Sequence, residues 1–305
     1  MPDSPIILLV DNGSTKAEAT LQLRSIAKQL SERTNQQIYP VSLQHADVIP
    51  ADDLDGVEAS VLKGFLQNQL KRGKHDFIIL PLFFGNSRAL TKFIPDVHIE
   101  LEALFGEFKL KIVDTLFPLP QSDTRLADII FDNIQRVAQE SSFLKHTPPL
   151  LHDVFHSNNH HVKVGGCASL NNIVLVDHGS PSPEITAVRN GVAEEVQARL
   201  GQEIKLELEQ AVMERREGKQ YDFNGELLED WLVAKAEQGM SGEESSAIVA
   251  LLFSLPGRHA GEGGDIVTIC ESVMQRYPNF KVGISPLVGE HPLLLEILAD
   301  RLNGI

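Results

Sequence analysis

A five-residue motif occurs twice in this chain and constrains its fold more than any other feature. VDNGS occupies Val10–Ser14 and VDHGS occupies Val176–Ser180, so the two copies are 166 residues apart. Each copy follows a short apolar run and precedes a stretch with helically spaced apolar residues, which is the pattern of a tight strand-to-helix turn. A repeat of this length predicts two related lobes rather than a solenoid of short units.

The repeat continues beyond the motif. Leu80–Pro95 (LPLFFGNSRALTKFIP) aligns with Ala250–Ile266 (ALLFSLPGRHAGEGGDI) at an offset of 170 residues, and Phe108–Pro120 aligns with Phe280–Pro292 at an offset of 172. The offset grows by only a few residues along the chain, and surface loops tolerate insertions of that size. We therefore expect equivalent strands and helices in the two lobes.

Length and composition agree with two globular lobes. The 305 residues, 42% of them hydrophobic, are enough for two domains that each bury a core. No run approaches the roughly 18 apolar residues of a membrane helix. The N-terminus has no features of a secretory signal, and the two cysteines, Cys167 and Cys270, do not make a disulfide framework, so we expect a cytoplasmic protein. The formal net charge of −15 argues against nucleic acid or an anionic membrane as partner.

Apolar runs of strand length alternate with amphipathic stretches of helix length in both halves. Continuous apolar strands that alternate with helices predict an α/β fold, here with a mostly parallel four-stranded sheet flanked by helices in each lobe. We expect strands at 6–10, 38–43, 77–84 and 110–113 in the first half and at 173–176, 204–213, 247–255 and 281–284 in the second, with helices at 16–33, 57–72, 96–105, 123–140, 184–200, 226–238, 265–277 and 291–302.

These runs predict an N-terminal lobe over 1–140 and a C-terminal lobe over 171–305. The segment between them, 141–170, holds Pro-Pro, Asn-Asn and Gly-Gly pairs and five histidines, and it is typical of an interdomain linker. His152 and His156 are four residues apart and could share a helix face, so metal binding by the linker is the alternative to a plain polar linker.

Three titratable residues of the second half follow or end predicted strands and have no titratable counterpart in the first half. His178, Glu214 and His259 align with Asn12, Gln44 and Ala89. Because ligands of such sheets bind outside the carboxyl ends of the strands, we expect the three to meet in one site. Two imidazoles and a carboxylate can bind a divalent metal ion with open coordination positions, or they can act as bases. His291 also follows a strand, and either a functional or a structural role fits it.

Two other interpretations of these segments are weaker. The glycine-rich stretch 256–265 (PGRHAGEGGD) could bind a phosphate at a helix N-terminus, but it lacks the Lys-Ser/Thr ending of a P-loop and the spacing of a dinucleotide fingerprint. We therefore expect no nucleotide cofactor. His178 and Ser180 do not indicate a hydrolase, because the chain has no G-x-S-x-G elbow. Ser14 and Ser180 are expected to cap helices, and Gly13 and Gly179 to permit the tight turns.

The motifs of the second half resemble those of a known family. VDHGSPSPE, the AVME that ends the second strand, LFSLPGRHAGEGGDI and PLVGEHPLLLEILADRL are similar to the CbiX/SirB group of class II chelatases, which insert cobalt or ferrous iron into sirohydrochlorin. The resemblance covers 171–305 with specific motifs and 5–139 more faintly. It implies two Rossmann-like lobes with the tetrapyrrole in the cleft between them, in a long form that is internally duplicated.

The resemblance also implies roles for individual residues. The paired metal-site histidines of the family carry over onto His178 and His259, and its acidic residue carries over onto Glu214. The first lobe departs from the family pattern at each of these positions and is expected to be catalytically degenerate. The metal substrate would be Co²⁺ or Fe²⁺, with Ni²⁺ and Zn²⁺ as further possibilities.

Basic side chains near the predicted strand ends complete this hypothesis. Sirohydrochlorin carries many carboxylates, and Arg215, Arg216, Lys219 and Arg258 could pair with them, although solvated surface cations are the simpler interpretation. A monomer is expected, because one duplicated chain would supply both lobes. The main alternative to an enzyme of cobalamin or sirohaem biosynthesis is a non-catalytic carrier or sensor that binds a metal or a tetrapyrrole. An inert structural paralogue is disfavoured by the retained histidine and glutamate residues.

Overall fold

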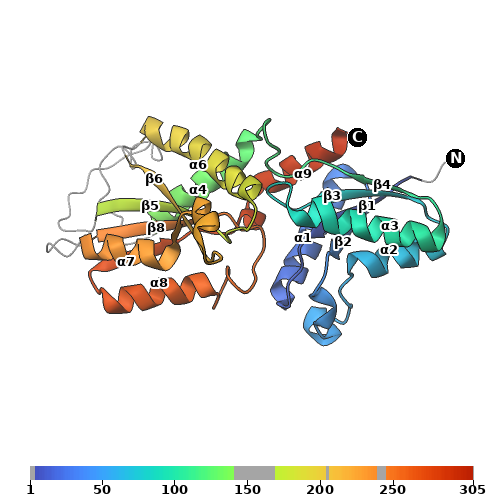
Figure 1. Ribbon diagram of the computed structural model, residues 1–305, viewed down its shortest axis with the longest axis horizontal. Helices are drawn as coiled ribbons and strands as arrows, with labels where there is room; N and C mark the ends of the chain where they lie inside the picture. Colours follow the sequence, from blue (N-terminus) through green and yellow to red (C-terminus); the bar gives the residue numbers. More distant parts are fainter. Residues whose placement is uncertain (1–3, 141–168, 204–205, 239–244, 305) are drawn as a thin grey trace. The chain divides into compact units, whose positions relative to one another are not determined.

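The computed structural model describes residues 4–140, 169–203, 206–238 and 245–304, so most of the histidine-rich segment 141–170 lies outside the described residues. The described chain is an α/β protein with two parallel sheets, one of four strands and one of five, each flanked by helices (Figure 1). The predicted fold class is thereby confirmed.

The first sheet has the strand order β2-β1-β3-β4, and all its pairs are parallel. Its central strands are apolar on both faces, because parallel strands between two helical layers have no solvated side. The helices α1 and α9 contact each other on one face of the sheet, and α2 and α3 contact each other on the other (Figure 1). The strands are β1 (Ile6–Asp11), β2 (Ile38–Ser42), β3 (Asp76–Pro81) and β4 (Lys109–Ile112), and the helices are α1 (Ala17–Thr34), α2 (Leu62–Lys71), α3 (Ile94–Phe105) and α9 (Leu293–Asn303).

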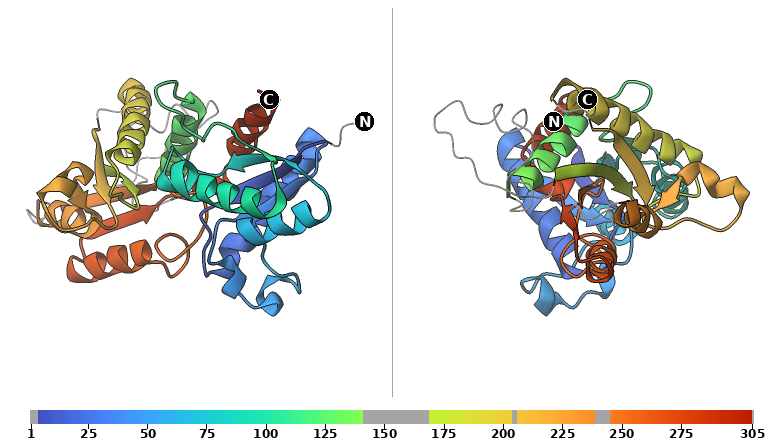
Figure 2. Two further views of the ribbon diagram at one scale, coloured as in Figure 1. Left: turned by 45° about the vertical axis from the view of Figure 1, so that its right-hand side comes forward. Right: turned by 90° about the vertical axis from the view of Figure 1, so that its left-hand side faces the viewer.

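The second sheet has the order β7-β6-β5-β8-β9 and is also parallel throughout. The helices α4 and α6 contact each other on one face, and α7 and α8 on the other, as the views in Figure 1 and Figure 2 show. The strands are β5 (Ser169–Asp177), β6 (Leu208–Val212), β7 (Glu226–Leu227), β8 (Ser245–Leu251) and β9 (Phe280–Ile284), and the helices are α4 (Thr124–Glu140), α6 (Pro183–Glu203), α7 (Leu228–Gln238) and α8 (Asp265–Arg276).

The short strand β7 was not predicted. Its two residues pair with Ala211 and Val212 of β6. The segment Met213–Asn224, called the insert below, separates β6 from β7 and returns the chain to the edge of the sheet. A two-residue pairing leaves no alternating or continuous apolar pattern, so the sequence indicated only the start of the following helix.

The compact units of the structure do not follow the lobes of the sequence repeat. The first unit contains the chain up to Asp123 together with 254–258 and 289–305, and the second contains 124–253 and 259–288. The last helix of each half is therefore exchanged: α4 packs on α6 of the second unit, and α9 packs on α1 of the first. Arg301 of α9 pairs with Asp123 at 2.8 Å, and Arg199 of α6 pairs with Asp128 of α4 at 2.6 Å.

The pairing registers reproduce the offsets of the sequence repeat. Pairs of strand residues in the first sheet correspond to pairs in the second at offsets of 166 for β1 and β5, 170 for β2 and β6 and for β3 and β8, and 172 for β4 and β9. The matching pairs are Asp11–Ser42 with Asp177–Val212, Val10–Pro81 with Val176–Leu251, and Ile79–Ile112 with Val249–Ile284. Residues aligned along the strands therefore occupy equivalent places in the two sheets.

None of the described helices combines the length and the apolar character that crossing a membrane would require.

Candidate metal site

The three residues singled out by the repeat lie together in the second unit. Atoms that can bind a metal, one each from His178, Glu214 and His259, all lie within 4.8 Å of one another. The Nε2 atoms of the two histidines are 3.0 Å apart, and Oε1 of Glu214 is 3.5 Å from Nε2 of His178. The imidazole rings meet edge to face, with centroids 4.5 Å apart.

Three neighbouring strands bring these side chains together. His178 directly follows β5, Glu214 lies two residues after β6, and His259 lies in the loop between β8 and α8. In the order β6-β5-β8 the carboxyl ends of parallel strands meet at one edge of the sheet, which is where open α/β sheets bind ligands. The convergence therefore follows from the topology.

Gly179 lets the main chains of His178 and Glu214 approach closely. Gly179 has φ +87°, and a Cβ on it would lie 2.0 Å from the main-chain oxygen of Glu214, which no other residue allows. The amide of Glu214 donates to the main-chain oxygen of His178 at 3.1 Å. Gly13 has the same φ, and its Cβ would lie 1.9 Å from the oxygen of Gln44, so the motif forms the same turn in the first unit.

The geometry of the three side chains suits a divalent ion. Two nitrogens that each lie about 2.1 Å from one ion at a near-tetrahedral angle are about 3.4 Å apart, close to the 3.0 Å between the two Nε2 atoms. The side chains of His178 and Glu214 are 49% and 60% exposed, while that of His259 is 17% exposed. A nitrogen and oxygen ligand set of this kind fits late first-row metals, and three ligands leave coordination positions open.

Oxygen atoms lie behind both imidazoles. Nδ1 of His259 is 2.9 Å from Oδ2 of Asp265, the first residue of α8, although the contact lacks the angle of a straight hydrogen bond. Nδ1 of His178 is 3.2 Å from the main-chain oxygen of Gly179. An oxygen at Nδ1 favours a proton there and leaves Nε2 free to bind a metal. Sequence reasoning missed Asp265, whose only signal was its place at the end of the glycine-rich loop.

Replacing Asp265 by alanine is expected to weaken metal binding about 10- to 100-fold, because partners of metal-binding histidines contribute on that scale. Titration calorimetry with Co²⁺ or Zn²⁺ measures the affinity, and circular dichroism checks the fold. Glu262→Ala is the matched control, since Glu262 is an exposed carboxylate of the same loop. Equal affinities of the Asp265→Ala variant and the wild type would contradict a role of Asp265 in orienting His259.

The basic residues predicted to bind tetrapyrrole carboxylates differ in their surroundings. Arg215 donates to the main-chain oxygen of Gly225 at 3.0 Å and lies 3.4 Å from Asp222, so it holds the insert in its fold. The guanidinium of Arg216 lies 5.9 Å from the ring centre of Tyr221. Arg216, Lys219 and Arg258 are exposed. Substrate binding by these residues stays a prediction.

His291 has a local structural role. It lies just before α9, and its Nδ1 accepts a hydrogen bond from the amide of Leu293 at 3.2 Å. This contact satisfies one of the amide groups that the first turn of a helix leaves without an intrahelical partner. The residue belongs to the first unit with α9 and is not part of the cluster of His178, Glu214 and His259.

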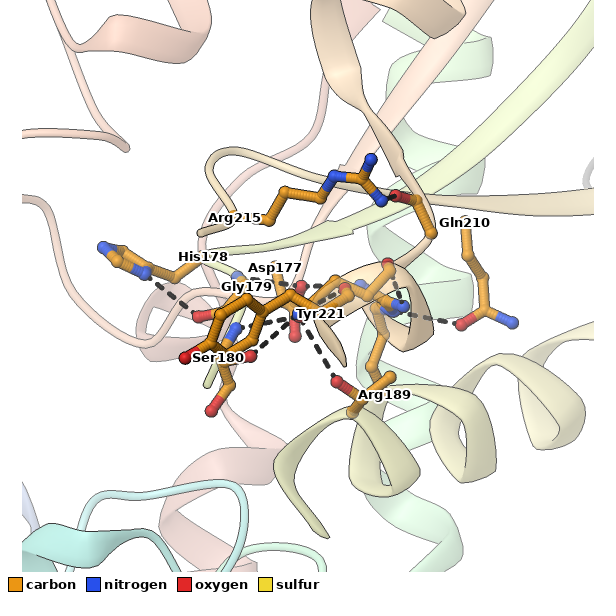
Figure 3. Close-up of polar contacts among 11 residues, drawn as sticks. Asp177, His178, Gly179, Ser180, Arg189, Gln210, Arg215 and Tyr221 are labelled. Atoms are coloured by element: carbon orange, nitrogen blue, oxygen red, sulfur yellow. Dashed lines mark hydrogen bonds and ion pairs between the residues drawn. The ribbon is translucent and has the colours of Figure 1, made fainter. Parts of the chain in front are cut away.

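A buried ion pair lies beneath the His178 turn (Figure 3). Asp177 and Arg189 are 8% and 3% exposed, and Nη1 of Arg189 donates to Oδ1 of Asp177 at 2.9 Å. Burial raises the pKa of Asp177, and the guanidinium of Arg189 opposes that rise. Sequence reasoning missed this pair; the signal was an aspartate present in both motifs, with Leu23 at the first-lobe position that aligns with Arg189.

Known proteins share the fold of this chain and, over its second half, its sequence pattern. Residues 172–304 match the model of the CbiX family. The structure is similar to SirB from Bacillus subtilis with Fe³⁺, with a TM-score of 0.61 and 12% identity over 99% of this chain and 95% of that one. It is also similar to CbiX, described as the terminal enzyme for biosynthesis of siroheme in denitrifying bacteria, with a TM-score of 0.53 and 14% identity over 98% of both chains.

A third similar structure is a multi-domain protein from Deinococcus radiodurans that is described as structurally similar to chelatases. The TM-score is 0.52 and the identity 12%, over 97% of this chain and 54% of that one. No curated protein sequence matches. Together, the family match and the structural neighbours confirm the resemblance to CbiX/SirB-type class II chelatases and the expected fold.

Proposed function

We propose that the chain, which residues 172–304 place with the CbiX/SirB-type class II chelatases, inserts a divalent metal ion into a tetrapyrrole of the sirohydrochlorin type. The observation that carries this proposal is the convergence of His178, Glu214 and His259 at the carboxyl ends of adjacent strands. The metal ion is Co²⁺ or Fe²⁺ and acts as a substrate. The reaction belongs to the biosynthesis of cobalamin or of sirohaem.

The two histidines and the glutamate have different tasks in this proposal. His178 and His259 bind the ion through neutral Nε2 atoms, which face each other at 3.0 Å. Two protons leave the pyrrole nitrogens when the metal enters the ring. Glu214 accepts them one at a time and passes each to water, because one carboxylate holds one proton and this side chain is exposed. Its carboxylate lies 3.5 Å from Nε2 of His178, so it is close to the ion without sharing the buried setting of His259.

Transfer also requires that the protein release the ion. A structural zinc site closes all four positions around the metal, whereas this cluster offers three ligands, two of them on exposed side chains. The metal affinity is therefore modest, and the ring nitrogens replace the protein ligands one after another. Because only neutral imidazole binds a metal ion, the affinity falls as the pH is lowered.

The first unit supplies structure rather than chemistry in this proposal. Asn12 and Gln44 occupy the places of His178 and Glu214 in the equivalent turn, and neither can take up a proton near neutral pH. We attribute the equivalence of the two sheets to internal duplication of an ancestral chelatase lobe, followed by loss of the ligands from one copy. A monomeric state stays a prediction.

Anaerobic incubation with sirohydrochlorin and either Co²⁺ or Fe²⁺, followed by absorbance spectroscopy, tests the proposal. The protein is expected to accelerate formation of the metallated ring well above the rate of metal and tetrapyrrole alone. A rate equal to that background with every divalent ion contradicts chelatase activity. Tight binding of metal or tetrapyrrole without acceleration would instead support a carrier or a sensor.

A further inference from the structure

The side chain of Asn224 is fully buried although it ends an exposed insert. Asn224 is 0% exposed, whereas the consecutive residues 214–220 of the insert are exposed. A buried amide needs partners for both its oxygen and its nitrogen. The partners of Asn224 are therefore informative about what the insert is attached to.

Asn224 binds the main chain of Ser180 from both sides. Its Oδ1 accepts from the Ser180 amide at 2.9 Å, and its Nδ2 donates to the Ser180 oxygen at 2.8 Å. Nδ2 also donates to the oxygen of Tyr221 at 3.2 Å within the insert. Two opposed hydrogen bonds to one residue fix both its distance and its orientation, as a strand pair does.

Arg189 holds the main chain of Asn224 and the base of the same turn; Figure 3 shows Arg189 with Asp177 and Gln210. Its Nη2 donates to the Asn224 oxygen at 2.8 Å, and its Nε donates to Oε1 of Gln210 at 3.1 Å. Its Nη1 binds Asp177, whose Oδ1 also accepts from the Gly179 amide at 3.1 Å. The residues on both sides of His178 are thus tied to the end of the insert.

The first unit shows that the shape of the turn does not depend on these contacts. Leu23 stands where Arg189 is expected from the offset, and within the described residues no side chain bonds to the main chain of Ser14, the counterpart of Ser180. The turn nevertheless has the same shape, with φ +87° at both Gly13 and Gly179. The hydrogen bonds of Asn224 therefore do not shape the turn; they connect it to the insert.

We infer that Asn224 is a positioning residue that holds the insert, and with it Glu214, at a fixed distance from His178. Glu214 lies at the beginning of the insert and Asn224 ends it. The insert is therefore fixed to the His178 turn at both ends. At its start, the main-chain amide of Glu214 donates a hydrogen bond to the main-chain oxygen of His178, and at its end Asn224 makes two hydrogen bonds with Ser180. The attachment is a property of the protein alone; its consequence for metal binding rests on the proposed function.

The experiment compares Asn224→Ala with the wild type in two measurements. Amide hydrogen exchange of the metal-free protein reports the attachment, and we expect exchange about 10-fold faster at Ser180 and across residues 214–225. Calorimetry with Co²⁺ measures the metal affinity, and we expect the affinity of Asn224→Ala to be about 10-fold lower than that of the wild type. Asn224→Asp keeps the acceptor and loses the donor, so it should fall between the two.

Asn172→Ala is the matched control, because Asn172 also donates to a main-chain oxygen, that of Ser246 at 3.1 Å, at the other end of β5. It should change neither measurement. Unchanged exchange in Asn224→Ala overturns the attachment. Faster exchange with wild-type Co²⁺ affinity overturns the positioning role. If the wild type binds no metal ion, the proposed function fails, and the exchange measurement alone decides whether Asn224 holds the insert.

Discussion

Replacing His178 or His259 by alanine is expected to lower the rate of metal insertion about 100-fold or more while the chain stays folded. Either change removes one of two facing Nε2 atoms, and the remaining histidine and Glu214 hold the ion poorly. The His178 side chain is half exposed and the protein core does not depend on it. The measurement is the initial rate of ring metallation under anaerobic conditions, with calorimetry for the metal affinity.

Two further variants test the role of Glu214 and control for the loss of any exposed histidine. Glu214→Gln installs the residue found at the equivalent position of the first unit, and it should reduce the insertion rate more than the metal affinity, since the amide cannot accept a proton. His75→Ala removes an exposed histidine of the first unit and should leave the rate unchanged. Alanine variants of His178 and His259 that retain most of the wild-type rate would show that the metal enters the ring elsewhere.

The location of this site could be predicted because it depends on strand ends and on sheet order. A residue that follows a buried parallel strand lies at the carboxyl edge of the sheet whatever the loops do. The glycine of the motif fixes the turn after it, since no side chain fits beside the oxygen of Glu214. The sequence therefore predicts, without knowledge of any contact, that His178, Glu214 and His259 lie close together.

The exchange of α4 and α9 between the compact units could not be predicted. Both helices show an apolar face in the sequence, but an apolar face by itself does not specify the sheet that it covers. The choice depends on tertiary contacts such as Arg301 with Asp123 and Arg199 with Asp128. Periodicity predicts that a helix forms and which side is buried, but not the sheet on which it packs.

The third pair of the repeat is equivalent in sequence but not in conformation. Ala89 begins the π-helical segment Ala89–Phe93, whereas His259 lies in the glycine-rich loop of bends and turns before α8. A Cβ on Gly264 would lie 2.9 Å from the main-chain oxygen of His259, so that loop depends on a glycine that the first unit lacks. Histidines and glutamate restored at Asn12, Gln44 and Ala89 are therefore not expected to converge as their counterparts do.

Sequence patterns likewise do not identify the partners of buried polar side chains. Arg189 sits on α6 at a place where the aligned residue of α1 is Leu23, and helical periodicity treats the two positions alike. The role of Arg189 becomes visible only in the structure, where its guanidinium contacts Asp177, Gln210 and Asn224. The aspartates of the two motifs, Asp11 and Asp177, are therefore both buried, but Asp177 pairs with the guanidinium of Arg189, whereas the first lobe has Leu23 at the aligned position.

Asp177→Asn is expected to destabilise the second unit by about 3–5 kcal/mol, because it leaves the buried charge of Arg189 without its partner. Unfolding in urea can be followed through Trp231, a buried residue of the second unit and the only tryptophan of the chain. The double variant Asp177→Asn/Arg189→Leu should recover part of the loss, since it removes both charges. A double variant as unstable as the sum of the two single variants would exclude coupling between these residues.

The corresponding substitution in the first unit, Asp11→Asn, is expected to raise stability rather than lower it. Asp11 is 8% exposed, its Oδ1 has no hydrogen-bond partner, and burial raises its pKa. A raised pKa in the folded state means that the stability contribution is present below the ordinary pKa and is lost as pH rises through the folded value. Asp11→Asn should therefore stabilise the first unit at pH 7 by about 1 kcal/mol or more, with the gain vanishing in acid. Hydrogen exchange of β1 and β3 at neutral and acidic pH measures this difference, and a loss of protection at pH 7 would show that the charge of Asp11 is compensated.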